Sequence, residues 1–155
     1  GDDESVAFTA ALLHDIGKIV LSEFLEHKYA EIIQETEASG HSMVETEKLL
    51  LGFDHAEVGG RLLERWNLPP SLVASVRYHH APSDAGDHTR LAAMVYLGNL
   101  IAHSMGCTSG YQSFALRGRA EIFEILQIAP EQWPLYLVRT WDKLQLAKSL
   151  LKIAG

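Results

Sequence analysis

The sequence predicts an all-α protein, a multi-helix bundle. Apolar residues recur at helical spacing through nearly all of the 155 residues, and the alternation typical of a half-buried strand is absent. Capping residues and glycines divide this pattern into segments of helical length. The length and the 47% apolar content suit one domain with its own core. We therefore expect residues 1–155 to form a single domain and, because the chain opens with Gly1 rather than Met, to be a piece of a longer protein.

The first helix is expected to run from Asp2 to about Ile16 and to end at Gly17, since glycine is a common helix terminator. Apolar residues occupy two faces of this helix, with Val6, Ala10 and Leu13 on one and Phe8 and Leu12 on the other. A helix that is apolar on two sides is predicted to be packed all round.

The remaining helices follow from start and stop residues. Gly40 and Gly52 end two of them, Ser42 and Glu45 form a capping box, and Asp54 opens the next helix in the same way. We expect these helices at residues 19–25, 27–39, 42–52, 54–66, 71–80, 91–105, 119–127 and 131–152, with loops at 81–87 and 106–119. The last helix carries an apolar stripe that is predicted to be core or a helix–helix contact: Trp133, Leu137, Trp141 and Leu144.

Charge and composition exclude several classes of protein. The chain has 13 Lys and Arg against 20 Asp and Glu, a net charge of −7, which argues against binding to a nucleic-acid backbone. The single cysteine, Cys107, indicates a reducing compartment. We find no apolar run of the roughly 18 residues that span a bilayer, and no signal peptide. The expectation is a cytoplasmic protein with neither a nucleic-acid nor a membrane partner.

Four apolar helices each carry a polar group on the inward face: His14 with Asp15, His55, His79 or His80, and Asn99. For any one of them, a hydrogen-bonded core residue is the simpler interpretation. Four together predict a metal site, because all-α proteins build such sites from facing helices and because a buried aspartate needs an ion or a partner. The other histidines are expected at the surface: His27, His41, His88 and His103.

Several motifs occur in a fixed order across residues 7–103. They are Ala-Leu-Leu-His-Asp-Ile-Gly-Lys at 11–18, Leu-Gly-Phe-Asp-His-Ala-Glu-Val-Gly at 51–59, Leu-x-x-Trp-x-Leu-Pro at 63–69 and Tyr-His-His-x-Pro at 78–82. In this order they resemble the HDOD domain, which belongs to the HD superfamily of metal-dependent phosphohydrolases and is related to the HD-GYP cyclic-di-GMP phosphodiesterases. The resemblance implies a helical bundle of the HD-domain type, with residues 119–152 as closing helices outside the motif-bearing region.

The resemblance also implies a role and a set of site residues. HDOD modules are bacterial cytoplasmic signal-transduction modules that stand beside sensor, receiver or cyclic-dinucleotide domains. The catalytic relatives hold one or two divalent metals. For this chain the expectation is a divalent ion, Fe, Mn or Mg, or a depleted site that holds none. Carried over residue by residue, the family's positions are, for the metal, His14, Asp15, His55 and His79 or His80 and, for the phosphate-facing lysine, Lys18.

Three departures argue against catalysis. Asn99 stands where catalytic relatives have a late aspartate, no histidine precedes His14, and Ala-Pro-Ser-Asp at 81–84 replaces the Gly-Tyr-Pro of HD-GYP enzymes. They favour a non-catalytic regulatory module with a degenerate metal site, whose partners are other signalling domains or proteins. The alternative is a metal-dependent phosphohydrolase that acts on a nucleotide or cyclic dinucleotide. A third interpretation stays open, in which the polar residues only bind one another, and the oligomeric state is open too.

Overall fold

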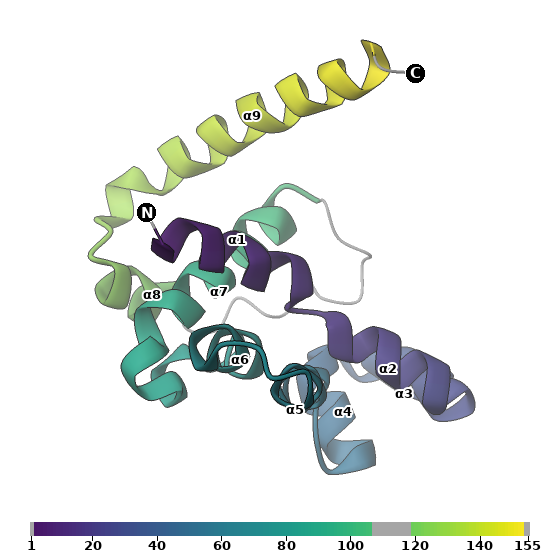
Figure 1. Ribbon diagram of the computed structural model, residues 1–155. Coiled ribbons are helices and arrows are strands. Elements are labelled where there is room, and N and C mark those ends of the chain that lie inside the picture. Colours follow the sequence, from purple (N-terminus) through teal and green to yellow (C-terminus); the bar gives the residue numbers. More distant parts are fainter. Residues whose placement is uncertain (1, 107–118, 154–155) are drawn as a thin grey trace.

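The computed structural model describes residues 2–106 and 119–153. All regular structure in these residues is helical, which confirms the predicted all-α class (Figure 1). The elements, in chain order, are α1 (Asp2–Leu13), α2 (Ile16–Phe24), α3 (Glu26–Ser39), α4 (Met43–Leu51), α5 (His55–Arg65), α6 (Pro70–Arg77), the 3-10 helix η1 (Pro82–His88), α7 (Thr89–Ser104), α8 (Arg119–Leu126), the 3-10 turn η3 (Pro130–Gln132) and α9 (Trp133–Ile153).

The pair of α5 and α6 lies at the centre of the bundle. Helix α2 packs on α5, α1 and α7 pack on α6, and α8 and α9 contact α7 (Figure 1). One buried apolar cluster joins α1, α5, α6 and α7: Ala10, Leu63, Leu72, Val73, Val76 and Val95. A second joins α7 and α8, with α9 packed against it: Ala93, Tyr96, Leu97, Leu100, Ile101, Ile122, Phe123 and Leu126. Helix α7 takes part in both clusters and therefore connects the central pair and α1 to α8 and α9.

The first helix ends earlier than predicted. Helix α1 stops at Leu13, His14 and Asp15 stand between two helices, and Gly17 lies buried inside α2 rather than terminating α1. A Cβ atom on Gly17 would lie 1.9 Å from the carbonyl oxygen of His55. The glycine therefore allows the backbones of α2 and α5 to touch. In the sequence alone, a glycine needed for such a contact cannot be distinguished from a glycine that ends a helix.

Most of the predicted helix boundaries are confirmed. Gly40 and Gly52 take positive φ angles of 72° and 83° at the ends of α3 and α4. The backbone N–H of Glu45 donates to Oγ of Ser42 at 3.2 Å, and that of Ser42 donates to Oε2 of Glu45 at 2.8 Å, which completes the capping box. The expected loop at 81–87 is largely the 3-10 helix η1, interrupted at Gly86. Most of the expected loop at 106–119 lies outside the described residues.

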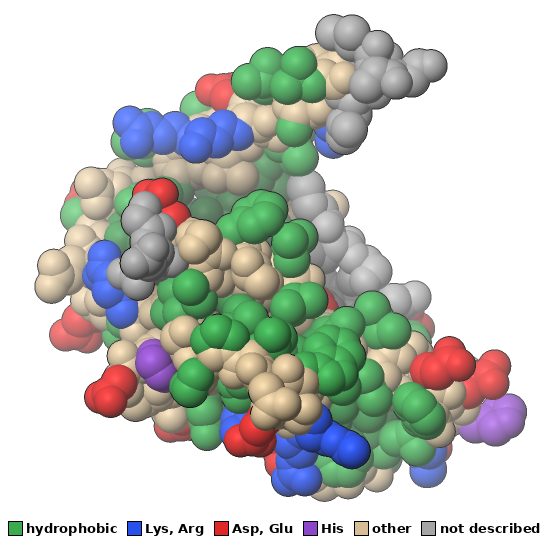
Figure 2. All heavy atoms as spheres, in the orientation of Figure 1, with side chains coloured by type: hydrophobic (Ala, Val, Ile, Leu, Met, Phe, Trp, Pro, Cys, Tyr) green, Lys and Arg blue, Asp and Glu red, His purple; other side chains and the backbone are tan. Residues whose placement is uncertain are grey.

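The prediction that the first helix is packed all round is wrong. Phe8 and Leu12 on α1 are 67% and 69% exposed, and hydrophobic side chains cover much of the face on which α1 and α2 lie (Figure 2). On α9, Trp133 and Leu137 pack against the second core cluster, as the stripe predicts, but Trp141 farther along is 49% exposed. Periodicity identifies an apolar face but not whether another element covers it.

Among the described residues, one helical stretch, Glu4–Phe24, is long and apolar enough to cross a membrane by length and composition alone. It comprises α1, the break at His14 and Asp15, and α2, and it contains Lys18, so the sequence shows no uninterrupted apolar run there. A single stretch of this kind is weak evidence for a span, because core helices and signal sequences meet the same criterion.

Substitution of Gly17 by Ala is expected to lower the free energy of unfolding by at least about 3 kcal/mol, because the new methyl group overlaps backbone atoms of α5 that cannot rotate away. Gly98→Ala on α7 is the matched control: its Cβ would meet no other atom within 4 Å, and alanine should stabilise the helix by about 1 kcal/mol. Urea denaturation of both variants measures the difference. Equal stabilities would show that α2 and α5 can separate without cost.

Candidate metal centre

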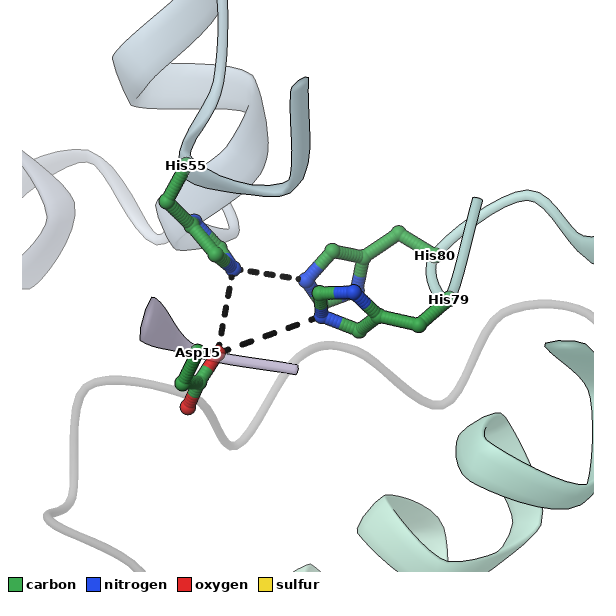
Figure 3. Close-up of side chains that lie close together, drawn as sticks. All are labelled: Asp15, His55, His79 and His80. Carbon is green, nitrogen blue, oxygen red and sulfur yellow. Dashed lines mark hydrogen bonds and ion pairs between the residues drawn. The ribbon is translucent and has the colours of Figure 1, made fainter. Parts of the chain in front are cut away.

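Four side chains from separate parts of the chain converge between α2, α5 and α6 (Figure 3). Each of Asp15, His55, His79 and His80 offers one ligand atom, and these atoms all lie within 4.8 Å of one another. Asp15 stands at the junction of α1 and α2, His55 opens α5, and the two adjacent histidines follow the end of α6. Helix α6 ends at Arg77, earlier than predicted, and both histidines then reach the cluster.

The hydrogen bonds of His79 leave one ring nitrogen available to an ion. Its Nδ1 lies 2.7 Å from the backbone carbonyl of Val76. Because a carbonyl oxygen only accepts, Nδ1 carries the proton and the neutral ring presents the lone pair of Nε2. That atom is buried and makes no hydrogen bond, and the same holds for Oδ1 of Asp15, 3.9 Å away. Oδ1 of Asp15 has an ion pair with His55 at 3.3 Å, whereas the lone pair of Nε2 on His79 has no donor. The unsatisfied nitrogen indicates a missing partner, and both atoms are good metal ligands.

A buried carboxylate, that of Glu47, orients His55. Its Oε2 accepts a hydrogen bond from Nδ1 of His55 at 2.6 Å and another from the backbone N–H of His55 at 2.9 Å. Both side chains are completely buried. The contact directs Nε2 of His55 toward Asp15, at 3.3 Å from Oδ1. A carboxylate behind a histidine is the usual way in which proteins fix the ring orientation of a metal ligand.

The sequence analysis missed Glu47. The available signal is its position one turn after Met43 on the buried face of α4, where an acidic residue requires a partner.

His80 completes the group. Its Nε2 lies 2.9 Å from Nε2 of His55, and the two rings meet edge to face with centroids 4.9 Å apart. Its ring also lies against that of His79, with centroids 3.9 Å apart. With Nδ1 of His55 committed to Glu47, the facing nitrogens of His55 and His80 either share one proton or both present lone pairs to a cation.

His14 and Lys18 lie on the other side of the Asp15 carboxylate. Nζ of Lys18 is 2.8 Å from Oδ2 of Asp15, and Nε2 of His14 is 3.4 Å from the same oxygen. Nδ1 of His14 donates to the carbonyl of Ala11 at 2.8 Å. His14 is outside the group of four, so the structure brings together four of the five residues predicted as ligands and places the fifth beside them.

The contribution of α7 differs from the expected one. Asn99 is half-buried on α7 and does not line the cavity that adjoins the group of four. One turn later, His103 lines that cavity of about 20 Å³ together with Lys18, His55 and His80. The prediction of a surface position for His103 is therefore wrong. Its spacing of four residues from Asn99 was the available signal, since residues i and i+4 share a helix face.

The environment favours the charged forms of Asp15 and His55. Burial acts to raise the pKa of Asp15, but His55 and the Lys18 ammonium outweigh it and hold that pKa well below the ordinary value. Burial likewise acts to lower the pKa of His55, but its contacts with Asp15 and Glu47 raise the pKa above the ordinary value. In the metal-free protein, His55 therefore keeps its second proton to a higher pH than an ordinary histidine, and an ion that binds at Nε2 displaces that proton.

The two histidines after α6 have the opposite tendency. Burial, then the neighbouring positive charge of His55, lowers the pKa of His79 to about 3. Burial, then the proximity of His79 and His55, lowers the pKa of His80 well below the ordinary value. Both rings are neutral near pH 7, the form in which imidazole binds a metal.

The all-helical fold, with a His-Asp pair at a helix break facing three further histidines, defines a helical module of the HD-superfamily type. A solved structure agrees: a protein from Shewanella amazonensis SB2B, described as a candidate phosphohydrolase, superimposes with a TM-score of 0.65 and is 27% identical. The match covers 86% of this chain and 49% of that one.

The particular family follows from the sequence profile. The profile of the HDOD domain matches residues 1–82, and the chain belongs to the HDOD family. An uncharacterised protein of Treponema pallidum (strain Nichols) is 26% identical over 118 residues, which is 72% of this chain and 22% of that protein. The chain therefore spans less than a quarter of this relative and about half of the solved structure.

Substitution of Glu47 by Ala is expected to destabilise the metal-free protein by about 3–5 kcal/mol, because it leaves Nδ1–H of the buried His55 ring and the backbone N–H of His55 without an acceptor. Glu57→Ala on α5 is the control: it breaks an exposed pair with Arg61 and should cost less than about 1 kcal/mol. Chemical denaturation in the presence of chelator gives both values. A cost for Glu47 as small as that for Glu57 would contradict the role of Glu47.

We also expect the metal-free protein to lose stability as the pH falls from about 6.5 to about 5. In the unfolded chain, His79 and His80 bind protons near pH 6.5, but in the folded protein they stay neutral. The unfolded state binds more protons, so the free energy of unfolding falls by up to about 1.4 kcal/mol per pH unit for each histidine. His55 has the opposite sign: its contribution is complete below pH 6.5 and is lost as the pH rises through its raised pKa.

Denaturation curves across this pH range test the assignment. His79→Asn should reduce the slope of stability against pH by about half, because one of two neutral histidines is removed. His27→Asn on the exposed side of α3 should leave it unchanged. The assignment fails if the His79 variant keeps the full slope.

Proposed function

We propose that this chain is a signal-transduction module that holds one divalent metal ion between Asp15, His55, His79 and His80 and turns over no substrate. The enclosure of the centre carries this proposal. His55 and His79 are fully buried, Asp15 and His80 are half-buried, and the cavity of about 20 Å³ beside Lys18 has room for one water molecule. Small-molecule sites are commonly on the order of 300–1,000 Å³. Such a centre is suited to holding helices together and to sensing, rather than to admitting a nucleotide.

The donor set favours a transition metal. Three imidazole nitrogens and one carboxylate oxygen suit iron or manganese better than magnesium, which prefers oxygen ligands alone. A bound ion would supply a cross-link between α2, α5 and the end of α6. The four ligand atoms all lie within 4.8 Å of one another, which supports a single ion. A cytoplasmic location in a bacterium and contact with other signalling proteins or domains belong to the same proposal.

One observation favours a second candidate, a phosphohydrolase acting on a nucleotide or cyclic dinucleotide. A larger pocket of about 730 Å³ on the outer side of α5 has His80 in its wall and is large enough for a nucleotide. If the chain is a phosphohydrolase, a bound ion would activate a water molecule and polarise the phosphoryl group of the substrate. Lys18, held 2.8 Å from Asp15, is the cation available to the developing negative charge.

Elemental analysis of protein purified without chelator and without a metal-affinity tag tests the metal centre. We expect about one equivalent of iron or manganese, since the four ligands are already oriented. His79→Asn and His80→Asn should lose it, and His27→Asn, an exposed histidine on α3, should retain it. Wild-type protein that stays metal-free after reconstitution with iron and manganese would contradict the proposal.

Phosphate release from a panel of nucleotides and cyclic dinucleotides separates the two candidates. The metal-loaded protein is expected to release none. Release that is lost in a folded Asp15→Asn variant would instead establish the phosphohydrolase, and the signalling module without turnover would then be rejected.

A further inference from the structure

The pocket of about 730 Å³, called the outer pocket from here on, shares one residue with the metal centre. Its walls come from the exposed face of α5, from the residues that follow α6 and from the end of α4, and they include His80, Tyr78, Arg77 and Arg65. Asp15, His55 and His79 are not in its lining. His80 therefore forms the partition between the outer pocket and the ion cluster.

His80 differs from the other two histidines of the centre at its Nδ1 atom, which has no hydrogen-bond acceptor among the described residues. Nδ1 of His55 donates to Glu47, and Nδ1 of His79 donates to the carbonyl of Val76. Among the described residues, the hydrogen-bond contact of the His80 ring is that of its Nε2 with His55; Nδ1 has none, is not among the unpartnered atoms closed off from solvent, and belongs to a half-buried residue of the outer-pocket wall. A ring that binds an ion through Nε2 carries its proton on Nδ1. His80 thus has a donor whose acceptor the described protein does not supply.

Arginines on the pocket wall offer charge to such an acceptor. Arg77 lies across α5 at Gly60, where a Cβ atom would come within 2.6 Å of the Cβ of Arg77. A glycine inside a helix lowers the stability of that helix by about 1 kcal/mol relative to alanine. Here the missing side chain leaves the space that Arg77 occupies. One end of the guanidinium, Nη2, pairs with Glu64 at 2.9 Å, while Nε is buried without a hydrogen bond. Arg65, on the same wall, is exposed.

The charges of the outer pocket balance, so recognition depends on directed donors rather than on net charge. Lys48, Arg61, Arg65 and Arg77 face Asp54, Glu57, Glu64 and Asp84 in its lining. Three of the cations already have carboxylate partners, and the partner of Arg77, Glu64, is 64% exposed. Exposed ion pairs contribute little, so an oxyanion can exchange with Glu64 at small cost.

We propose that the outer pocket binds a small organic oxyanion, a phosphate ester or a carboxylate, one oxygen of which accepts the Nδ1 proton of His80. Arg77 and Arg65 pair with its charge, and Tyr78 and the neighbouring alanines pack against its organic part. The oxyanion then accepts the Nδ1 hydrogen bond of His80, as the Glu47 carboxylate accepts that of His55. Because an acceptor behind a metal-binding histidine increases the basicity of the ring, the ligand tightens the metal, and by linkage the metal tightens the ligand. This inference rests on the proposed metal centre and supplies the signal that the module would sense.

The test measures binding of Mn²⁺ by chelator competition, with and without saturating inorganic phosphate or acetate as probes. At least one oxyanion should tighten Mn²⁺ by about tenfold, the size of effect expected of an outer hydrogen-bond partner. Whichever of the two probes is effective identifies the chemical class. Arg77→Gln and Arg65→Gln should abolish the effect, whereas Arg90→Gln, an exposed arginine on α7 outside the outer pocket, should retain it. Arg65 is exposed, so its variant remains informative if the Arg77 variant fails to fold.

Calorimetry of the oxyanion with metal-free protein completes the test. Binding that is weaker than in the metal-loaded protein, and that is lost in Arg65→Gln, supports the outer pocket. An effect that needs the metal and survives both arginine variants would mean that the anion ligates the ion directly, and it would overturn the inference. Failure of Mn²⁺ to bind at all would reject the metal centre itself, whereas Mn²⁺ binding that neither probe changes would reject the outer pocket alone.

Discussion

The contact between Gly17 and the first turn of α5 is the constraint on which the centre depends. The absence of a side chain on Gly17 lets α2 reach the carbonyl oxygen of His55. Asp15 stands two residues before this contact and His55 is the contact itself, so backbone packing brings the carboxylate near the imidazole. The hydrogen bond to Glu47 then directs Nε2 of His55 to 3.3 Å from Oδ1 of Asp15. The His-Asp pair and the glycine two residues after it thus act together. The pair provides polar ligand groups, and the glycine allows α2 and α5 to approach closely enough for Asp15 and His55 to meet.

Burial of so many ionisable groups requires compensation, and the structure provides it unevenly. Glu47 is neutralised by His55, and Asp15 by Lys18 and His55. Oδ1 of Asp15 and Nε2 of His79 are left without hydrogen bonds at the point where the ligand atoms meet. An apolar core of the same volume would avoid this cost altogether. The arrangement is understandable if a cation belongs there, because one ion satisfies all the inward-facing atoms together.

Local sequence rules predicted the elements whose cause is local. The capping box at Ser42 and the glycine at the end of α3 depend on residues a few positions away, and both appear as expected. Gly17 was predicted to end a helix but lies inside α2. A glycine at a helix end and a glycine at a close contact between two backbones look alike in the sequence until the second helix is placed. The ligands Asp15, His55, His79 and His80 could be nominated because each is a polar residue on an apolar face, and the order of the motifs added the resemblance to a family.

The sequence could not predict which helix faces pack against one another. Glu47 sits in a short helix that packs on α3, and its role is visible only when His55, at the start of α5, is placed against its carboxylate. His103 looks like a surface residue until α7 is placed beside the cluster. The same limit explains Phe8 and Leu12, whose apolar character predicts burial although no described element covers them. Binary patterning gives the side of a helix that prefers an apolar neighbour, and only the assembled fold shows whether that neighbour is present.

The spacing of the ligands along the chain has a consequence for how the molecule opens. Asp15 and His80 stand at the two ends of a segment that contains α2 to α6, so a bound ion would close a loop of about 65 residues, and a covalent link across such a loop removes roughly 4 kcal/mol of chain entropy from the unfolded state. Helices α1, α7, α8 and α9 lie outside that loop, although α1 and α7 pack on α6. Metal occupancy would therefore stabilise α2 to α6 directly and α8 and α9 least. Amide exchange in α5 and α6 would slow with the ion in place, and the far half of α9 would continue to open on its own.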